Sequence, residues 1–134
     1  FSDPPINYLH CTVEGQTARL GGNIEFMLAN HLQFLPAGQY MFGIRSNHLS
    51  LNRTSSEDTE IRTKVQLSEI NGSETFIHVN YNNSRLVVQE NGVYPHRMGT
   101  EISIYVHPSC FFVFDEAGAL VASPARYTIE KGLR

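Results

Sequence analysis

Residues 61–69 read Ile61-Arg62-Thr63-Lys64-Val65-Gln66-Leu67-Ser68-Glu69, and apolar side chains alternate with polar ones along this stretch. Successive side chains of a β-strand point to opposite faces, so the odd-numbered positions share one face and the even-numbered positions share the other. The odd face, from Ile61 to Glu69, holds the apolar residues, whereas the even face holds Arg62 and Lys64. The pattern predicts a strand with one face in the core, Leu67 included, and the other face in water.

Turn signals follow this strand and divide the next part of the chain into short strands. The pairs Asn71-Gly72, Asn82-Asn83 and Asn91-Gly92 favour tight hairpin turns, because Asn and Gly adopt positive φ angles readily. The segments between the pairs, 75–81 and 85–89, are rich in strand-forming residues. Three consecutive strands joined this tightly predict an antiparallel meander.

The rest of the chain gives further short strand signals and no convincing long helix. Strands are expected at 7–13, 17–20, 23–28, 39–45, 48–51, 101–106, 110–115 and 119–122, with one helical turn at 29–33. Residues 52–59 are polar and are expected to form a mobile loop. About ten short strands in 134 residues predict an all-β barrel or sandwich, and periodicity alone does not choose between the two.

Length, composition and charge restrict the class of protein. A length of 134 residues fits one domain, 1–134, with a core large enough to fold without disulfides or metals. The formal net charge of -3 offers no basic surface to a phosphate backbone, which argues against a nucleic-acid partner. The longest apolar run, Cys110–Phe114, is too short to span a bilayer, and the first residues do not resemble a signal peptide.

Residue types that perform catalysis or bind metals do not fall into functional patterns. The six histidines lack zinc-ligand spacing, and only two cysteines accompany them. The chain has neither a Gly-x-Ser-x-Gly nucleophile motif nor a Gly-x-x-x-x-Gly-Lys-Ser/Thr phosphate loop. His78 is interpreted as a packed or half-exposed residue of the strand 75–81. The sequence therefore predicts no catalytic residue, cofactor site or metal site in this chain.

Four phrases carry a resemblance to a known family. They are the passage 1–7 with Pro4-Pro5-Ile6-Asn7, the turn Gly43-Ile44-Arg45-Ser46-Asn47-His48, the segment Gly72–Val79, and the run from Gly99 to Asp115. Together they resemble the C-terminal regulatory domain, of the TOBE or OB type, of the ATP-binding subunit of a bacterial sugar-type ABC importer, similar to the maltose and glycerol-phosphate importer ATPases. The family usually has Pro-Glu where this chain has Ser46-Asn47.

The resemblance implies an OB-like barrel in which the start of the chain joins strands from its end. It implies a non-catalytic regulatory and dimerisation domain of an importer for carbohydrates, polyols or glycerol phosphate. ATP and Mg would be bound by an ATPase domain absent from this sequence, with residues 1–7 as the junction and 123–134 as a polar tail. The implied partners are that ATPase domain, a second ATP-binding subunit, the permease subunits and a regulatory protein, on the cytoplasmic side of the inner membrane.

Five residues are candidates for interface or regulatory contacts: Gly43, Arg45, His48, Gly72 and Glu74. Arg45 follows a strand into a turn, where its guanidinium suits either a structural bond that fixes the turn or a carboxylate of another protein. His48 is expected to cap local backbone beside that turn. Glu74 lies in a Gly-Ser-Glu-Thr loop like one in the family, whose exposed loops serve regulator contacts; simple solvation of the carboxylate is the alternative.

Two other interpretations stay open. In an extracellular immunoglobulin-like domain Cys11 and Cys110 would form a bridge, although the chain has no Trp for the core of such a domain; two free thiols in a cytosolic domain are the other interpretation of the pair. The remaining possibility is a barrel that senses a small molecule within the importer.

Overall fold

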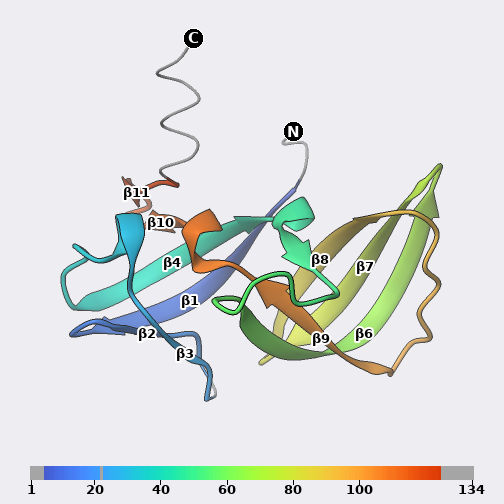
Figure 1. The fold of residues 1–134 in the computed structure, drawn as a ribbon, viewed down its shortest axis with the longest axis horizontal. Coiled ribbons are helices and arrows are strands. Elements are labelled where there is room, and N and C mark those ends of the chain that lie inside the picture. The colour runs from blue at the N-terminus through green and yellow to red at the C-terminus, as the bar shows by residue number, and fades with distance from the viewer. Residues whose placement is uncertain (1–4, 22, 125–134) are drawn as a thin grey trace, which may run out of the picture. The chain divides into compact units, whose positions relative to one another are not determined.

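The structure, a computed structural model, describes residues 5–21 and 23–124, and its regular secondary structure is mostly β-strand (Figure 1). These residues form eleven strands in two antiparallel sheets, together with three short 3-10 helices. The all-β, OB-like prediction is therefore confirmed. The number of strands is close to the ten expected, because the turn residues that separate them are local signals in the sequence.

The chain divides into two compact units, and each is described by itself. Unit 1 comprises the chain up to Asn7 and the segment Ile44–Val106, whereas unit 2 comprises Tyr8–Gly43 and the chain from His107. The prediction of a single domain stays a prediction.

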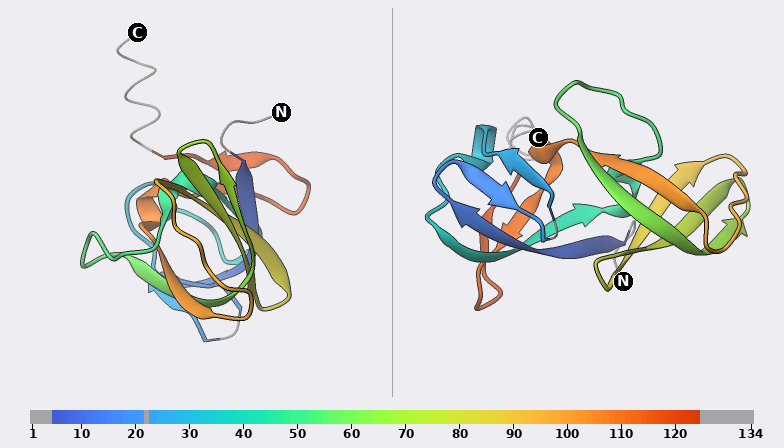
Figure 2. Two further views of the ribbon diagram at one scale, coloured as in Figure 1. Left: turned by 90° about the vertical axis from the view of Figure 1, so that its right-hand side faces the viewer. Right: turned by 90° about the horizontal axis from the view of Figure 1, so that it is seen from below.

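Unit 1 contains a five-stranded sheet that curls into a nearly closed barrel (Figure 2). Its strands, in spatial order, are β5 (Leu49–Ser50), β9 (Glu101–Val106), β6 (Thr59–Asn71), β7 (Glu74–Tyr81) and β8 (Ser84–Asn91). The two edge strands, β5 and β8, approach each other and leave a seam. Completely buried aliphatic side chains, among them Ile61, Ile77 and Leu86, fill the interior. Burial of each such side chain contributes about 1.5–3 kcal/mol to folding.

The long strand β6 corrects one prediction from the sequence. Its alternation holds from Ile61 to Val65, both buried, but Leu67 is 48% exposed. The cause is an irregularity in the pairing of β6 with β7: Val65 pairs with Val79 and Leu67 pairs with His78, so Gln66 is an extra residue. A β-bulge of this kind shifts the following side chains to the other face of the sheet. Leu67 and Glu69 therefore point away from the core face that Ile61 occupies.

Tight turns of two residues connect β6 to β7 and β7 to β8. The second turn lies at Asn82 and Asn83, as predicted, whereas the first lies at Gly72 and Ser73, one residue later than the predicted pair Asn71-Gly72. Asn71 pairs with Glu74 across the first turn, where Gly72 has a φ of +67°. Asn82 and Asn83 form the second turn with φ angles of 50° and 66°. Positive φ at both central residues is the geometry of a type I′ turn, whose twist matches that of the two strands.

Unit 2 is organised around a second antiparallel sheet, of six strands. Their spatial order is β11 (Leu120–Ala122), β10 (Phe112–Phe114), β4 (Gly38–Arg45), β1 (Ile6–Glu14), β2 (Thr17–Arg19) and β3 (Glu25–Met27). The family expectation placed the start of the chain beside strands from its end; β1 and β10 do share this sheet, with β4 between them. The expected helical turn is the 3-10 helix η1 (Asn30–Leu32).

Aromatic packing forms the core of unit 2. The rings of Phe42 and Phe111, both completely buried, meet edge to face with centroids 5.1 Å apart. Phe26 stacks on Phe111 at 5.7 Å. Such ring pairs add about 0.5–1.5 kcal/mol beyond the area that they bury. The apolar run 110–114 of the sequence therefore supplies the core, as its composition suggests.

The polar loop 52–59 has an internal anchor that its composition does not reveal. Asp58 is 8% exposed, and its Oδ2 accepts hydrogen bonds from the backbone amides of Thr54 and Ser55 at 2.8 and 3.1 Å. The guanidinium of Arg53 donates to the carbonyl of Asp58 and lies 5.1 Å from the centroid of the Tyr105 ring. A carboxylate that accepts several amide protons restrains a loop, while the expected mobility of this segment stays a prediction.

Candidate functional site

The side chain of Asn7 links the beginning of the chain to β8, an edge strand of the barrel. The amide of Asn7, 6% exposed, donates from Nδ2 to the carbonyl of Val87 at 2.9 Å and accepts from the amide of Val87 at 2.8 Å. This pair of bonds is the one that a neighbouring strand would make with Val87, so Asn7 takes the place of backbone. Asn7 therefore satisfies the backbone amide and carbonyl of Val87 at the edge of β8, 80 residues away in the sequence.

Ser46, in the turn that follows β4, adds hydrogen bonds that link this turn to the start of the chain and to β8. The residue opens the 3-10 helix η2 (Ser46–His48) and is completely buried. Its amide donates to the carbonyl of Pro5 at 2.8 Å, and its Oγ donates to Oε1 of Gln89 at 3.2 Å. A proline, which the family usually has here, offers neither donor. The departure from the family pattern thus supplies two hydrogen bonds within unit 1.

Gln89 carries the network to Glu74, one of the candidate residues. Its Nε2 donates to Oε2 of Glu74 at 2.9 Å, across the hairpin of β7 and β8. Because Oε1 of Gln89 is held by Ser46, the amide group has a defined orientation with its donor toward Glu74. Three segments that are distant in the sequence, at Pro5–Asn7, Ser46 and Glu74, are therefore linked by hydrogen bonds through β8.

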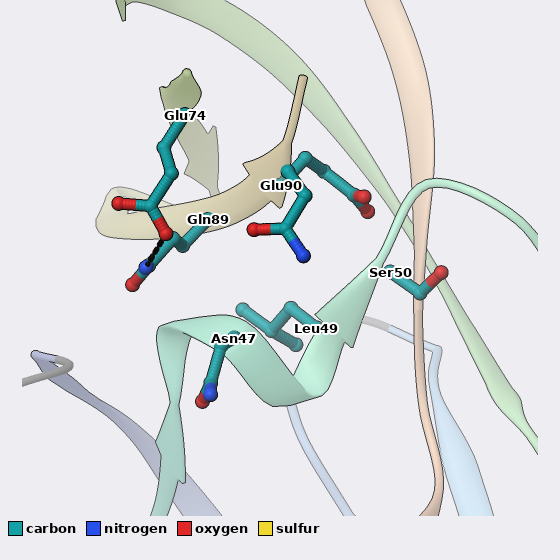
Figure 3. Close-up of a pocket in the computed structure, with 7 residues that line it drawn as sticks. Asn47, Leu49, Ser50, Glu74, Gln89 and Glu90 are labelled. Atoms are coloured by element: carbon teal, nitrogen blue, oxygen red, sulfur yellow. Dashed lines mark hydrogen bonds between the residues drawn. The ribbon is translucent and has the colours of Figure 1, made fainter. Parts of the chain in front are cut away.

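A polar pocket of about 310 Å³ lies at this place, in the seam of the barrel (Figure 3). It is lined by Asn47, Leu49, Ser50, Glu74, Gln89, Glu90 and Asn91. Figure 3 shows Glu74, Gln89 and Glu90 on the β7–β8 side, and Asn47, Leu49 and Ser50 on the η2–β5 side. The carboxylate of Glu90 accepts from the amide of Leu51 at 3.1 Å, which ties the two sides together. Carboxylates, amides and a hydroxyl thus surround one small space.

The structure brings some of the predicted site residues together and separates others. Glu74 lines the pocket, and in the chain Arg45 comes two residues before the pocket residue Asn47 and His48 directly after it. Gly72 belongs to the turn just before Glu74. Gly43 is assigned to unit 2, where it pairs with Phe112 of β10. Contacts of these residues with another protein stay a prediction.

Sequence reasoning missed the residues that connect the site. Gln89 and Glu90 lie in an expected strand and carry no motif, so only the closure of the barrel gives them a role. Asn7 belonged to the Pro-Asn phrase of the resemblance, but a single Asn at the start of a strand does not predict a partner 80 residues away. A buried Asn is normally hydrogen-bonded on both amide atoms, which is the one general signal available.

The histidines do not gather into a metal-binding group in the ranges 5–21 and 23–124. His78 is half-buried on β7, as predicted, and its Nε2 lies 2.8 Å from Oε1 of Glu69. No group of three or more His, Cys, Asp or Glu residues that could hold a metal ion is found within those ranges. In the same ranges, no helix is long and apolar enough to cross a membrane.

A second pocket, of about 290 Å³, lies in unit 2. It is lined by His31, Phe34, Leu35, Pro36, Tyr40, Asp115, Val121 and Ala122. Several of its polar groups have partners within unit 2: Nε2 of His31 donates to the carbonyl of Phe111 at 2.7 Å, and the Tyr40 hydroxyl donates to the carbonyl of Pro36, whereas the buried Nδ1 of His31 has no hydrogen-bond partner among the described residues. Oδ1 of Asp115 accepts two backbone amides of the turn that follows it. The pocket of unit 1 is taken as the candidate site because it contains Glu74, one of the residues predicted from the sequence.

Neither Cys11 nor Cys110 forms a disulfide, so the bridge required by the immunoglobulin-like interpretation is not formed. Cys11 is buried between the strands of unit 2, and Cys110 is partly exposed. Burial raises the pKa of the Cys11 thiol to about 12, because the thiolate would lose its hydration. At neutral pH Cys11 is a protonated core residue.

The chain was compared with family models and with curated protein sequences. No family model matches it, and no curated protein matches it significantly. The resemblance to importer regulatory domains therefore rests on the four phrases of the sequence alone.

Proposed function

We propose that this chain is a non-catalytic regulatory and dimerisation domain of the ATP-binding subunit of a bacterial ABC importer for carbohydrates, polyols or glycerol phosphate. In this proposal ATP and Mg are bound by an ATPase domain outside this sequence. The partners are that ATPase domain, a second ATP-binding subunit, the permease subunits and a regulatory protein. The assembly lies on the cytoplasmic face of the inner membrane.

The observation that supports the proposal most is that three of the segments that carry the resemblance are hydrogen-bonded to the same strand, β8. The passage ending at Asn7, the turn at Ser46 and the loop at Glu74 are joined by hydrogen bonds through Val87 and Gln89. In the proposed subunit the passage 1–7 leaves the ATPase domain. A displacement of that passage would therefore act directly on the residues beside the pocket, which is the physical link that a regulatory domain needs.

Self-association of the chain through the surface around Glu74 tests the proposal. Two-fold pairing brings a patch against its own copy, and a charge of -3 leaves little long-range repulsion at physiological salt. We expect weak dimers with a dissociation constant in the micromolar to millimolar range, because the ATPase domains would supply most of the natural interface. Exchange of the half-buried Glu74 for Arg is expected to shift this equilibrium, since it reverses a charge within the patch.

Sedimentation equilibrium at several concentrations measures the effect, with circular dichroism as the control for folding. Glu101→Arg is the matched control, because Glu101 carries the same charge but is 67% exposed on β9 and lies outside the pocket. A strictly monomeric chain at millimolar concentration would remove the dimerisation proposal. An equilibrium equally affected by both variants would remove the assignment of the patch around Glu74.

A further inference from the structure

We propose that Asn71 is a site of spontaneous deamidation, and that the fold protects Asn91, the other asparagine of this sequence that precedes a glycine. The two pairs, Asn71-Gly72 and Asn91-Gly92, have the same local chemistry. A difference between them in the folded chain therefore comes from the structure. The inference goes beyond the proposed function, because it concerns a covalent change of the chain itself.

Deamidation at an Asn-Gly pair begins with the amide nitrogen of the glycine. This nitrogen gives up its proton and attacks Cγ of the asparagine, so that a bond forms between N and Cγ while the bond between Cγ and Nδ2 breaks and ammonia leaves. Water then opens the resulting succinimide ring at either carbonyl, which gives aspartate or isoaspartate. The net reaction consumes water, releases ammonia and replaces the amide by a carboxylate. It requires a free nitrogen and a backbone that can rotate.

The nitrogen of Gly72 meets both conditions. Asn71, Gly72 and Ser73 are exposed at the end of the β6–β7 hairpin (Figure 1). In the part of the chain that the structure describes, the amide of Gly72 donates to no other group, and a Cβ built at Gly72 would meet no atom within 4 Å. The pairing of Asn71 with Glu74 closes the turn, and the closing pair of a hairpin opens at a small cost in free energy.

The nitrogen of Gly92 meets neither condition. Its amide donates to the carbonyl of Ser73 at 2.6 Å. The carbonyl of Gly92 accepts from Oγ1 of Thr75 at 2.8 Å, and Thr75 is completely buried. The ring of Tyr94 packs against the same glycine, because a Cβ built there would lie 2.9 Å from Cε2 of Tyr94. Rotation of this backbone would break both hydrogen bonds and displace the ring.

Deamidation at residue 71 adds a carboxylate beside Glu74. Asn71 lies directly opposite Glu74 in the register of β6 and β7, and side chains in such a pair are close neighbours. Like charges in these positions repel each other. The isoaspartate form also lengthens the main chain at the pair that closes the turn. The surface around Glu74, for which the sequence predicts contacts with other proteins, therefore becomes more acidic as the chain ages.

The test is incubation of the folded chain in H₂¹⁸O at mildly alkaline pH, followed by tryptic digestion in ordinary water and mass spectrometry. Cleavage after Lys64, Arg85 and Arg97 places Asn71 and Asn91 on separate peptides. Opening of the succinimide by solvent adds one ¹⁸O atom, and fragmentation identifies the residue and its isoaspartate form. We expect Asn71 to convert at least about fivefold faster than Asn91, the factor that corresponds to one net hydrogen bond.

The same chain unfolded in guanidinium chloride is the matched control, and there the two asparagines should convert at similar rates. Asn71→Gln should abolish conversion at residue 71, because glutamine would have to form a larger and slower ring. Thr75→Val removes the hydroxyl that holds Gly92 and should speed conversion of Asn91 while Asn71 is unaffected. Thermal unfolding shows whether this variant folds; if it does not, the comparison of the folded and unfolded native chain decides.

Two results would overturn the inference. One is a ratio of the two rates that is the same in the folded and the unfolded chain, because the fold would then protect neither residue selectively. The other is an Asn71 that stays intact in the folded chain during the time in which the unfolded chain converts, because the turn would then be as well protected as Gly92.

Discussion

Replacement of Asn7 by Ala is expected to loosen the connection between the start of the chain and the barrel. The substitution removes both hydrogen bonds to Val87, at 2.9 and 2.8 Å, and leaves the amide and carbonyl of Val87 without their partners. A hydrogen bond contributes about 0.5–1.5 kcal/mol net, so the free energy of unfolding should fall by about 2 kcal/mol. For a chain of this size that is a decrease in Tm of roughly 8 °C.

Thermal unfolding and hydrogen exchange at Val87 measure this effect together. Because unit 1 and unit 2 can unfold at different temperatures, exchange of the Val87 amide reports the local loss directly, and it should accelerate in Asn7→Ala. Asn52→Ala is the matched control, since Asn52 is exposed in the polar loop of the same unit. A decrease in Tm no larger than that of the control, or unchanged exchange at Val87, would refute the backbone-like role of Asn7.

A second substitution, Asn7→Asp, tests the donor separately. An ionised Asp still accepts from the amide of Val87 but has no proton for its carbonyl, so this variant should be destabilised at neutral pH. When the carboxyl is protonated it donates again, so the folded state binds that proton more tightly than the unfolded state does. The variant should therefore regain stability as the pH falls, relative to the native chain. A pH-independent difference between the two proteins would contradict the assigned geometry.

Two further predictions concern Cys11 and Asp58. Cys11 should resist iodoacetamide in the folded chain at pH 8 while Cys110 reacts, because burial raises the pKa of Cys11 to about 12; reaction of both at equal rates would contradict its burial. The folded state keeps the Cys11 proton above pH 9.0, the ordinary pKa of the thiol, so the free energy of unfolding should fall as the pH rises from 9.0 toward 12, and Cys11→Ala should flatten that slope in urea titrations. Asp58→Ala removes the anchor of the loop and should lower the free energy of unfolding by about 1–3 kcal/mol and speed tryptic cleavage after Arg53; an unchanged cleavage rate would show that other contacts hold the loop.

The elements of this fold were largely predictable from the sequence, because the signals for strands and tight turns are local. Alternation of side chains located β6 up to Val65, the pair Asn82-Asn83 located one hairpin turn, and the pair Asn71-Gly72 located the other to within one residue. Each of these signals depends on neighbouring residues and on the φ angles that Asn and Gly tolerate. The burial of Phe111 also follows from an apolar run that has to leave water.

Tertiary structure alone decided where the register breaks and where the site lies. The bulge at Gln66 turns Leu67 outward. No local residue preference predicts this bulge, because the bulge depends on how β6 and β7 pair. Gln89 and Glu90 become site residues only when the barrel curls and brings β8 toward β5. The bond between Asn7 and Val87 spans 80 residues, and such a contact depends on closure of the whole chain rather than on any property of Asn7 itself. The sequence by itself thus determined the strands and their turns, whereas the folded chain determined which polar side chains meet in the seam.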